Sequence, residues 1–119
     1  MMSIKNTDVV IKEKVNIARN TYFQVLISKE EGPNFAMRRF IIEPGGRIPE
    51  HTNTVEHEQF VIKGQARIGI GGKTFEVKKN NIVFIPAGVP HWYETKGDEA
   101  FEFLCMIPNK EDKMEILGD

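Results

Sequence analysis

Three histidines are the residues of this chain whose type and placement could do chemistry. His51, His57 and His91 each stand next to a turn or at the end of an apolar segment. Residues two apart in a strand share a face, so His51 and Asn53 can point together, and His57 has the same parity unless a bend intervenes. A β-barrel can bring His91 beside them from a distant strand. Three imidazoles meeting in a dry interior would bind a divalent transition metal such as Mn, Fe, Ni, Cu or Zn.

The same spacing permits a plainer interpretation of the histidines. Single histidines are usually surface residues or hydrogen-bonded core residues, and the sequence contains no metal motif of the HExxH or CxxC kind. Spacing alone therefore leaves two alternatives open, a shared metal site and three unrelated histidines.

The elements that must position these side chains are short. Segments rich in β-branched and aromatic residues occur at 21–27, 35–43, 59–62, 66–70, 73–77, 82–85 and 100–107. The Pro-Gly-Gly at 44–46 is expected to end the second strand, and the Gly-Gly at 71–72 to form a hairpin turn. The stretch 109–119 is polar and indicates a helical or frayed tail. So many short strands and turns predict an all-β sandwich or barrel.

Length and composition indicate one globular domain. The 119 residues carry a formal net charge of −1 and 40% apolar residues, with scattered lysines. That balance argues against nucleic-acid binding, and no apolar run reaches the length of a membrane span. The single cysteine, Cys105, cannot form an intrachain disulfide, and the N-terminus lacks the apolar core of a signal peptide. A cytoplasmic protein is therefore expected.

Two strings around the histidines resemble the paired motifs of the cupin superfamily. The first family motif, G-x5-H-x-H-x(3,4)-E-x6-G, is matched at Gly45, His51 and Gly64. The second, G-x5-P-x-G-x2-H-x3-N, is matched at Pro86, Gly88 and His91. The order and spacing of the motifs are similar to those of the smallest microbial cupins, and the two strings span about half of the chain.

The chain departs from the family pattern at Asn53, which stands where the family has its second histidine. Around it the string is similar to the H-x-H-x-x-E-H-E of one cupin subgroup, in which the histidine between the glutamates is a ligand; His57 holds that position here. The resemblance thus implies metal ligands His51, His57 and His91. Asn53 would be a weak fourth ligand, or it would hydrogen-bond a metal-bound water and leave a coordination position open. Alternatively, the loss of one ligand leaves the site empty.

The second motif and the flanks of His57 contain further substitutions and charges. Asn80 replaces the leading glycine, which asparagine's tolerance of positive φ allows, and Thr95 replaces the final asparagine. Glu56 and Glu58 flank His57, so alternation turns both outward if His57 points inward. A solvated outer pair is the favoured interpretation, and a role in orienting ligands or accepting a proton is the alternative.

In two of the expected strands, it matters which side chains point into the barrel. Cys105 alternates with Phe103, and that face is expected to be inward because Glu102, on the other face, prefers solvent. Cys105 would then lie toward the cavity, as a core filler or as a contact of metal or substrate. Arg38 and Arg39 are adjacent, so one faces each side of their strand. An inward arginine would indicate an anionic substrate, and a salt bridge at the barrel rim or dimer interface is the alternative.

The resemblance also implies an architecture and an activity. It implies a double-stranded antiparallel β-barrel of the jelly-roll type, with one domain over 1–119 and a core at about 20–108. An N-terminal strand region at 4–19 would pair with a second subunit in a homodimer, and 109–119 would be a tail. The expected function is metal-dependent catalysis on a small molecule, most plainly an oxygenase using Fe(II) or Mn(II), with isomerisation or decarboxylation at the same open site. The alternative is a non-catalytic module that binds a small ligand or a metal.

Overall fold

Turns rich in glycine, proline and asparagine divide residues 2–118, the part of the chain that the computed structural model describes, into ten strands and one short 3-10 helix. In chain order these elements are η1 (Thr7–Val9), β1 (Glu13–Lys14), β2 (Arg19–Ile27), β3 (Phe35–Asn53), β4 (His57–Lys63), β5 (Gln65–Ile70), β6 (Lys73–Lys78), β7 (Ile82–Ile85), β8 (His91–Lys96), β9 (Phe101–Pro108) and β10 (Met114–Ile116). The strands pair antiparallel throughout. The predicted all-β class is confirmed.

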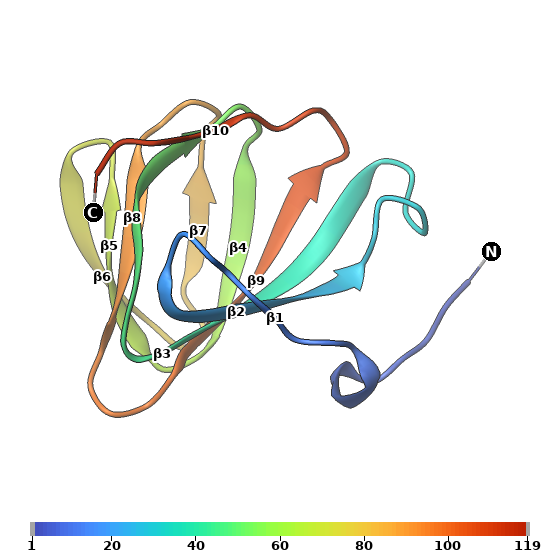
Figure 1. Ribbon diagram of the computed structural model, residues 1–119, viewed down its shortest axis with the longest axis horizontal. Helices are drawn as coiled ribbons and strands as arrows, with labels where there is room; N and C mark the ends of the chain where they lie inside the picture. Colours follow the sequence, from blue (N-terminus) through green and yellow to red (C-terminus); the bar gives the residue numbers. More distant parts are fainter. Residues whose placement is uncertain (1, 119) are drawn as a thin grey trace.

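The long strand β3 is the centre of a single curled sheet. The order along the sheet is β6-β5-β8-β3-β9-β4-β7, with β2 and β10 also paired to β3 and β1 paired to β2. Figure 1 shows the sheet curling around an interior, with strands far apart in sequence lying side by side. This is the expected antiparallel jelly-roll barrel, and it brings the ends of β3, β4 and β8 together.

β3 corrects one expectation, because it continues through the Pro-Gly-Gly at 44–46 instead of ending there. Gly45 takes a φ of 78°, and the register against β2 shifts between Arg19 and Thr21. The irregularity bends the strand without ending it, as a bulge does. One strand therefore reaches from the wall that holds Arg38 to the end of the barrel that holds His51.

The C-terminal segment is also not the helical or frayed tail that its polarity indicates. β10 pairs with β3, with Met114 opposite Asn53 and Ile116 opposite His51. Backbone bonds from Leu117 to the Glu50 carbonyl, at 2.8 Å, extend the pairing. Main-chain hydrogen bonds to β3 fix this exposed strand, and its three residues, Met114–Ile116, are too few for sequence periodicity to reveal it.

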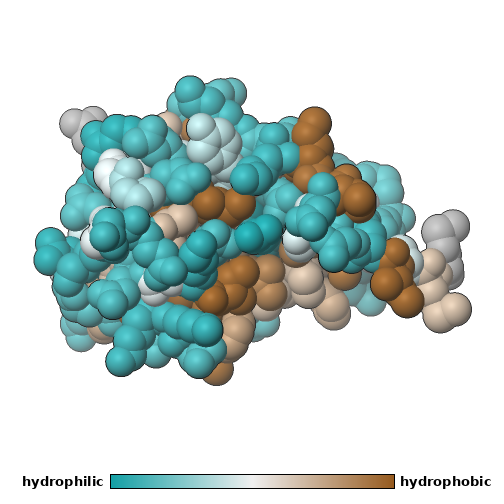
Figure 2. Space-filling model, turned by 90° about the horizontal axis from the view of Figure 1, so that it is seen from below, coloured by the Kyte–Doolittle hydropathy of each residue, from teal (hydrophilic) through white to brown (hydrophobic). Residues whose placement is uncertain are grey.

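The N-terminal region at 4–19 contains much less strand than expected. It has the helix η1, the two-residue strand β1 and the first residue of β2. Buried Gln24 fastens this region to the barrel, since its Nε2 donates to the Thr7 carbonyl at 3.0 Å and to the Val10 carbonyl at 2.9 Å. Figure 2 shows apolar side chains, in brown, both near the N-terminal end and near the middle of a mostly polar face. None of the helices in residues 2–118 has the length and apolar character needed to cross a bilayer.

Local turn chemistry agrees with the sequence interpretation at two points. Gly71 and Gly72 have φ values of 59° and 84° and join β5 to β6 as a two-residue hairpin, the geometry of a type I′ turn. Asn80 takes a φ of 76°, the positive value expected where the family motif has glycine. These turns set the register of the strands that close the barrel.

Inward-facing side chains of six strands form the barrel's interior. Its apolar cluster comprises Ile42, Ile48, Val61, Ala66, Ile68, Val83, Ile85, Tyr93, Phe101, Phe103 and Cys105. Burial alternates along β8 and along β4 as far as Val61, so these strands present every second residue inward. The inward row of β4 begins at His57 and that of β8 at His91, so the two histidines stand at the start of their rows.

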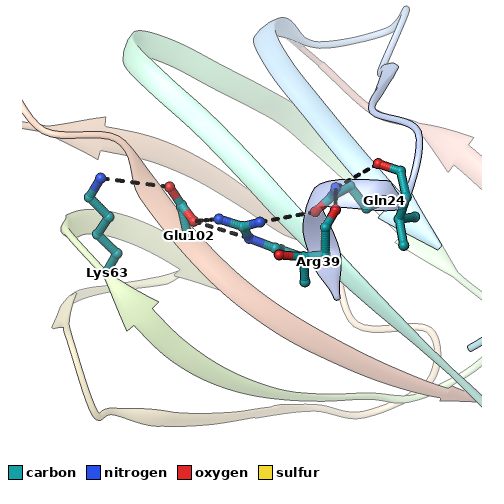
Figure 3. A network of polar contacts seen from close by, with 6 residues as sticks. Gln24, Arg39, Lys63 and Glu102 are labelled. Carbon is teal, nitrogen blue, oxygen red and sulfur yellow. Dashed lines mark hydrogen bonds and ion pairs between the residues drawn. The ribbon is translucent and has the colours of Figure 1, made fainter. Parts of the chain in front are cut away.

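Glu102 corrects a second expectation, because its carboxylate is buried rather than solvent-exposed. Its Oε1 accepts from Arg39 Nε at 3.1 Å, and Lys63 Nζ lies 3.9 Å from its Oε2 (Figure 3). Arg39 Nη1 also donates to Gln24 Oε1 at 3.0 Å. The ion pair explains why a charged residue is tolerated there, since buried charges require partners. Phe103 and Cys105 nevertheless face inward, as expected.

Candidate metal and ligand site

A cavity of about 200 Å³ opens inside the barrel beside the apolar cluster. Phe23, Phe40, Ile48 and Phe103 contribute apolar wall, and His51, Asn53 and His57 contribute polar groups. The volume is somewhat larger than the roughly 150 Å³ of an apolar cavity that holds benzene. The cavity therefore suits a ligand of about one ring or a short chain.

The three histidines gather where β3, β4 and β8 meet. His51 and His91 are direct partners across the β3–β8 pairing, and their ring centroids are 4.2 Å apart. His57 begins β4, and its ring centroid lies 5.5 Å from that of His91. All three residues are buried. The barrel thus brings His51, His57 and His91 together, as the sequence predicts. Despite the bend between Asn53 and His57, both residues point inward.

The backbone holds each imidazole in one tautomer. Nδ1 of His51 lies 2.7 Å from the Pro49 carbonyl, and Nδ1 of His91 lies 2.9 Å from the Val89 carbonyl. His57 repeats the contact, with Nδ1 at 3.2 Å from the carbonyl two residues earlier. A carbonyl only accepts, so each Nδ1 carries the hydrogen and each Nε2 keeps its lone pair. Nε2 of His91 is buried without a hydrogen-bond partner among the described residues.

Burial keeps these imidazoles neutral. Loss of solvation lowers the pKa of His57 and of His91 to about 4, from an ordinary value of 6.5. For His57 the second cause is the nearby positive charge of Arg38. Desolvation also lowers the pKa of His51. Three neutral imidazoles with free lone pairs are the protonation state that metal binding requires.

Asn53 is oriented by a residue that the sequence interpretation missed. Its Nδ2 donates to Asp112 Oδ2 at 3.0 Å, and the other Asp112 oxygen accepts from the Thr54 backbone at 3.0 Å. The Asn53 Oδ1 is buried and has no hydrogen-bond partner within the described chain. The amide is thus held with its nitrogen toward Asp112 and its oxygen free. The backbone of the loop before β8 is tied to the same residue, since Gly88 N donates to the Asn53 carbonyl at 2.8 Å.

Two further cavity residues are Gln59, which the sequence interpretation missed, and Tyr93, for which the sequence leaves open whether it lines a pocket or fills the core. Gln59 Nε2 donates to the Tyr93 hydroxyl at 2.7 Å and lies 3.6 Å from Cys105 Sγ. Burial raises the pKa of Tyr93, so its phenol stays protonated. The signal for both was available, because each stands two residues after a clustered histidine and so shares its inward face.

The remaining predicted residues divide between the inside and the outside of the barrel. Arg38 and Cys105 line the cavity, and Arg38 Nη2 donates to Cys105 Sγ at 3.3 Å. Arg39 faces the other side of β3, as alternation requires. Glu56 and Glu58 are exposed, in agreement with a solvated outer pair.

The donor chemistry of the cluster fits a divalent metal. His91 Nε2 and Asn53 Oδ1, which have no hydrogen-bond partner among the described residues, are nitrogen and oxygen donors of the kind that borderline metals accept. Among residues 2–118, no three His, Cys, Asp or Glu side chains form a preformed group for an ion. The site is therefore a candidate by the chemistry of its donor atoms.

Fold and interior define this protein as a jelly-roll barrel with a polar cluster at one end of an apolar cavity. Residues 38–107, more than half of the chain, match the family model described as a cupin domain. The chain therefore belongs to the cupin family.

Its relatives carry several different names. The chain is 30% identical over 98 residues to the 1-methylthio-D-xylulose 5-phosphate methylsulfurylase of Rhodospirillum rubrum. The matched stretch covers 82% of this chain and 62% of that protein. It is 30% identical over 71 residues to the acireductone dioxygenase of Cronobacter sakazakii, covering 56% of this chain and 39% of that one. The solved structure of the polyketide cyclase RemF from Streptomyces resistomycificus superimposes with a TM-score of 0.88 at 28% identity, covering 100% of this chain and 89% of that chain. This chain thus spans less than two thirds of both curated relatives.

Proposed function

We propose that this cupin is a metal-dependent enzyme acting on a small molecule. His51, His57 and His91 would hold one divalent ion, with Asn53 as a weaker fourth ligand. The observation that carries the proposal is the pair of buried donors without partners, His91 Nε2 and Asn53 Oδ1, beside two more neutral imidazoles. Unsatisfied buried polar atoms are costly, so a native site that keeps them is expected to satisfy them with a ligand.

An oxygenase using Fe(II) or Mn(II) is the chemistry that we favour. Bound there, such an ion would supply Lewis acidity and one-electron chemistry with its charge unneutralised by the ligands. The chain's own residues provide the environment. The carbonyls behind each Nδ1 fix the imidazole orientations, the phenylalanine walls exclude water, and the protonated Tyr93 phenol can donate a hydrogen bond to a bound oxygen-bearing ligand. A relative named acireductone dioxygenase supports this reaction type.

A non-catalytic module that captures a small ligand or a metal is the second candidate. It is supported by the absence of carboxylates among the described residues that line the cavity, which leaves no acid–base pair inside. Oxygen chemistry needs no such pair when the metal does most of the work. Turnover is therefore the property that separates the two candidates.

Elemental analysis of protein purified without an affinity tag tests the metal site. We expect about one transition metal per chain in the wild type and in the matched control Glu58→Ala, and loss of the metal in His57→Ala. Glu58 is a suitable control because it is the exposed neighbour of His57 on β4. No metal in any sample, even after soaking with each ion, would exclude the metalloenzyme proposal.

Oxygen uptake tests catalysis separately. Acireductone is the first substrate to offer, with Fe(II)-loaded wild type and His57→Ala compared in an oxygen electrode. Uptake by the wild type that is absent in His57→Ala supports the oxygenase. Stoichiometric metal without uptake would favour the non-catalytic module.

A further inference from the structure

Arg38 is the one charged side chain among the described residues that line the cavity. It reaches inward from β3, and the described lining residues include no lysine and no carboxylate. The cavity therefore has a net positive charge in apolar surroundings. A site of this kind attracts an anion.

The guanidinium of Arg38 is poorly satisfied within the chain. Its Nη2 donates to Cys105 Sγ at 3.3 Å, and its Cζ lies 4.9 Å above the Phe40 ring. Sulfur is a weak acceptor, and an aromatic face replaces only part of the lost hydration. The Nε–H is buried without any acceptor among residues 2–118. At least one of five donors is therefore left for a ligand or remains unsatisfied.

The neighbouring Arg39 shows what a satisfied arginine looks like on the same strand. It donates to the buried carboxylate of Glu102 and to Gln24. For Arg38, no carboxylate oxygen of the described chain lies within 4.0 Å. Partly buried charges without a counterion are costly, so Arg38 is held in a state that a bound anion would stabilise.

A surface carboxylate is the rival explanation for Arg38. Arg38 also borders an outer hollow that Glu111 lines. Glu111 is exposed, however, and its Oε1 lies 4.0 Å from Lys113 Nζ, so it has a cation of its own. A Glu111→Gln variant distinguishes an outer ion pair from an inner ligand.

We infer that Arg38 anchors a subsite for the carboxylate of a small molecule with an apolar body. A planar guanidinium pairs with a planar carboxylate through parallel hydrogen bonds, which sulfur and an aromatic ring cannot replace. The cavity of about 200 Å³ and its phenylalanine walls accept one ring or a short hydrocarbon chain. Because His51 and His57 line the same cavity, a molecule held at Arg38 lies beside the histidine cluster. This assignment deepens the proposed function by naming its substrate class, and it rests on that function only for the chemistry that follows binding.

Calorimetric titration of the full chain with benzoate and with its neutral analogue benzamide tests the subsite. Both probes match the cavity in size, and they differ in the carboxylate. Each is titrated before and after metal removal with EDTA, so that binding to a metal is separated from binding to Arg38. The variants are Arg38→Gln, Arg38→Lys, Glu111→Gln and the matched control Arg67→Gln. Arg67 is a suitable control because it pairs with Glu76 on the exposed face of β5.

We expect the wild type to bind benzoate at least tenfold more tightly than benzamide, with or without metal. Arg38→Gln should weaken benzoate binding about 30-fold, equal to about 2 kcal/mol, and leave benzamide unchanged. Arg38→Lys should fall between, because it keeps the charge and loses the planar fork. Arg67→Gln and Glu111→Gln should bind as the wild type does.

Several results would overturn the assignment. These are equal binding of the two probes, failure of both to bind, an unchanged preference in Arg38→Gln, and loss of benzoate binding on EDTA treatment alone. A gain in benzoate affinity in Glu111→Gln would assign Arg38 to the outer ion pair instead. Inorganic phosphate binding as tightly as benzoate would show that the apolar walls contribute nothing. A metal content equal to the wild type in Arg38→Gln separates this test from that of the metal site.

Discussion

Acidification of the metal-free protein should destabilise it in a pH range set by its buried histidines. Burial lowers the pKa of His57 and of His91 to about 4, whereas both return to about 6.5 in the unfolded chain. Between these values the unfolded chain binds more protons than the folded one, so the free energy of unfolding falls as the pH falls. The stabilisation is complete above pH 6.5 and is lost as the pH falls to 4.

The size of the effect follows from the two shifts. One pKa unit corresponds to 1.36 kcal/mol, so each histidine contributes about 3 kcal/mol over the window. Together the two losses approach the whole free energy of unfolding of a typical domain, about 5–15 kcal/mol. The metal-free protein should therefore unfold near pH 5 under mild denaturant. The chain has only three histidines, and the salt-bridged carboxylate of Glu31, with a pKa lowered to about 2, loses its pairing only at lower pH.

Urea titrations at pH 7, 6, 5 and 4.5, followed by the fluorescence of the single tryptophan, measure this slope. EDTA-treated wild type should lose stability steadily below pH 6.5. His57→Gln and His91→Gln should each have a clearly smaller slope than the wild type, whatever their stability at pH 7, and His51, whose pKa burial also lowers, should account for part of the slope that remains. A free energy of unfolding that is constant from pH 7 to 5, or an unchanged slope in both variants, would refute the assignment of neutral buried imidazoles.

Four further predictions concern the surroundings of the site and the barrel. Asp112→Asn should weaken metal binding about 10-fold to 100-fold in competition with a chelator, because the substitution frees the Asn53 amide to turn. The double variant Asn53→Ala/Asp112→Asn should bind metal no more weakly than Asn53→Ala alone. Glu102→Ala should cost about 3 kcal/mol in urea unfolding by leaving Arg39 unpaired, and the double variant Arg39→Met/Glu102→Leu should recover much of that loss. Gly64→Ala should lower the free energy of unfolding by at least about 2 kcal/mol, because at its φ of 79° an added Cβ would lie 2.2 Å from the Ala100 carbonyl oxygen. Gly97→Ala is the matched control, since Gly97 has a φ of 81° and no atom near an added Cβ. Its loss of about 1 kcal/mol should measure the cost of the positive φ alone. Light scattering should detect a homodimer that Ile4→Lys/Val9→Lys/Ile11→Lys dissociates, because these apolar side chains of the N-terminal region are exposed, and a monomeric wild type would contradict this.

The sequence predicted the barrel and the histidine cluster because both depend on local signals. A period of two fixes which residues share a strand face, so it correctly put Cys105 on the face of Phe103 and Arg38 and Arg39 on opposite sides. Motif spacing joined His91 to His51 across a long sequence separation. The hairpin at 71–72 followed from glycine's access to positive φ alone.

The failures share a cause, because each depends on a contact with a distant partner. Glu102 is buried since Arg39 and Lys63 supply its counterions, and no pattern within β9 records that. β10 exists because β3 offers it backbone groups, and its three residues are too few for a periodic pattern to predict a strand. Asp112 was missed for the same reason.

Asp112 also changes what Asn53 means for the site. From the sequence, Asn53 could be either a degraded histidine position or a ligand, and chemistry alone favours neither. A carboxylate that accepts from the Asn53 nitrogen holds the amide in one orientation, with the oxygen aimed away from Asp112 and left without a partner. A residue drifting after loss of a ligand would have no reason to keep its amide oriented by a carboxylate from the segment between β9 and β10. The C-terminal segment therefore contributes to the polar cluster, and this supports the proposal that the Asn53 oxygen acts together with the three imidazoles as one donor set.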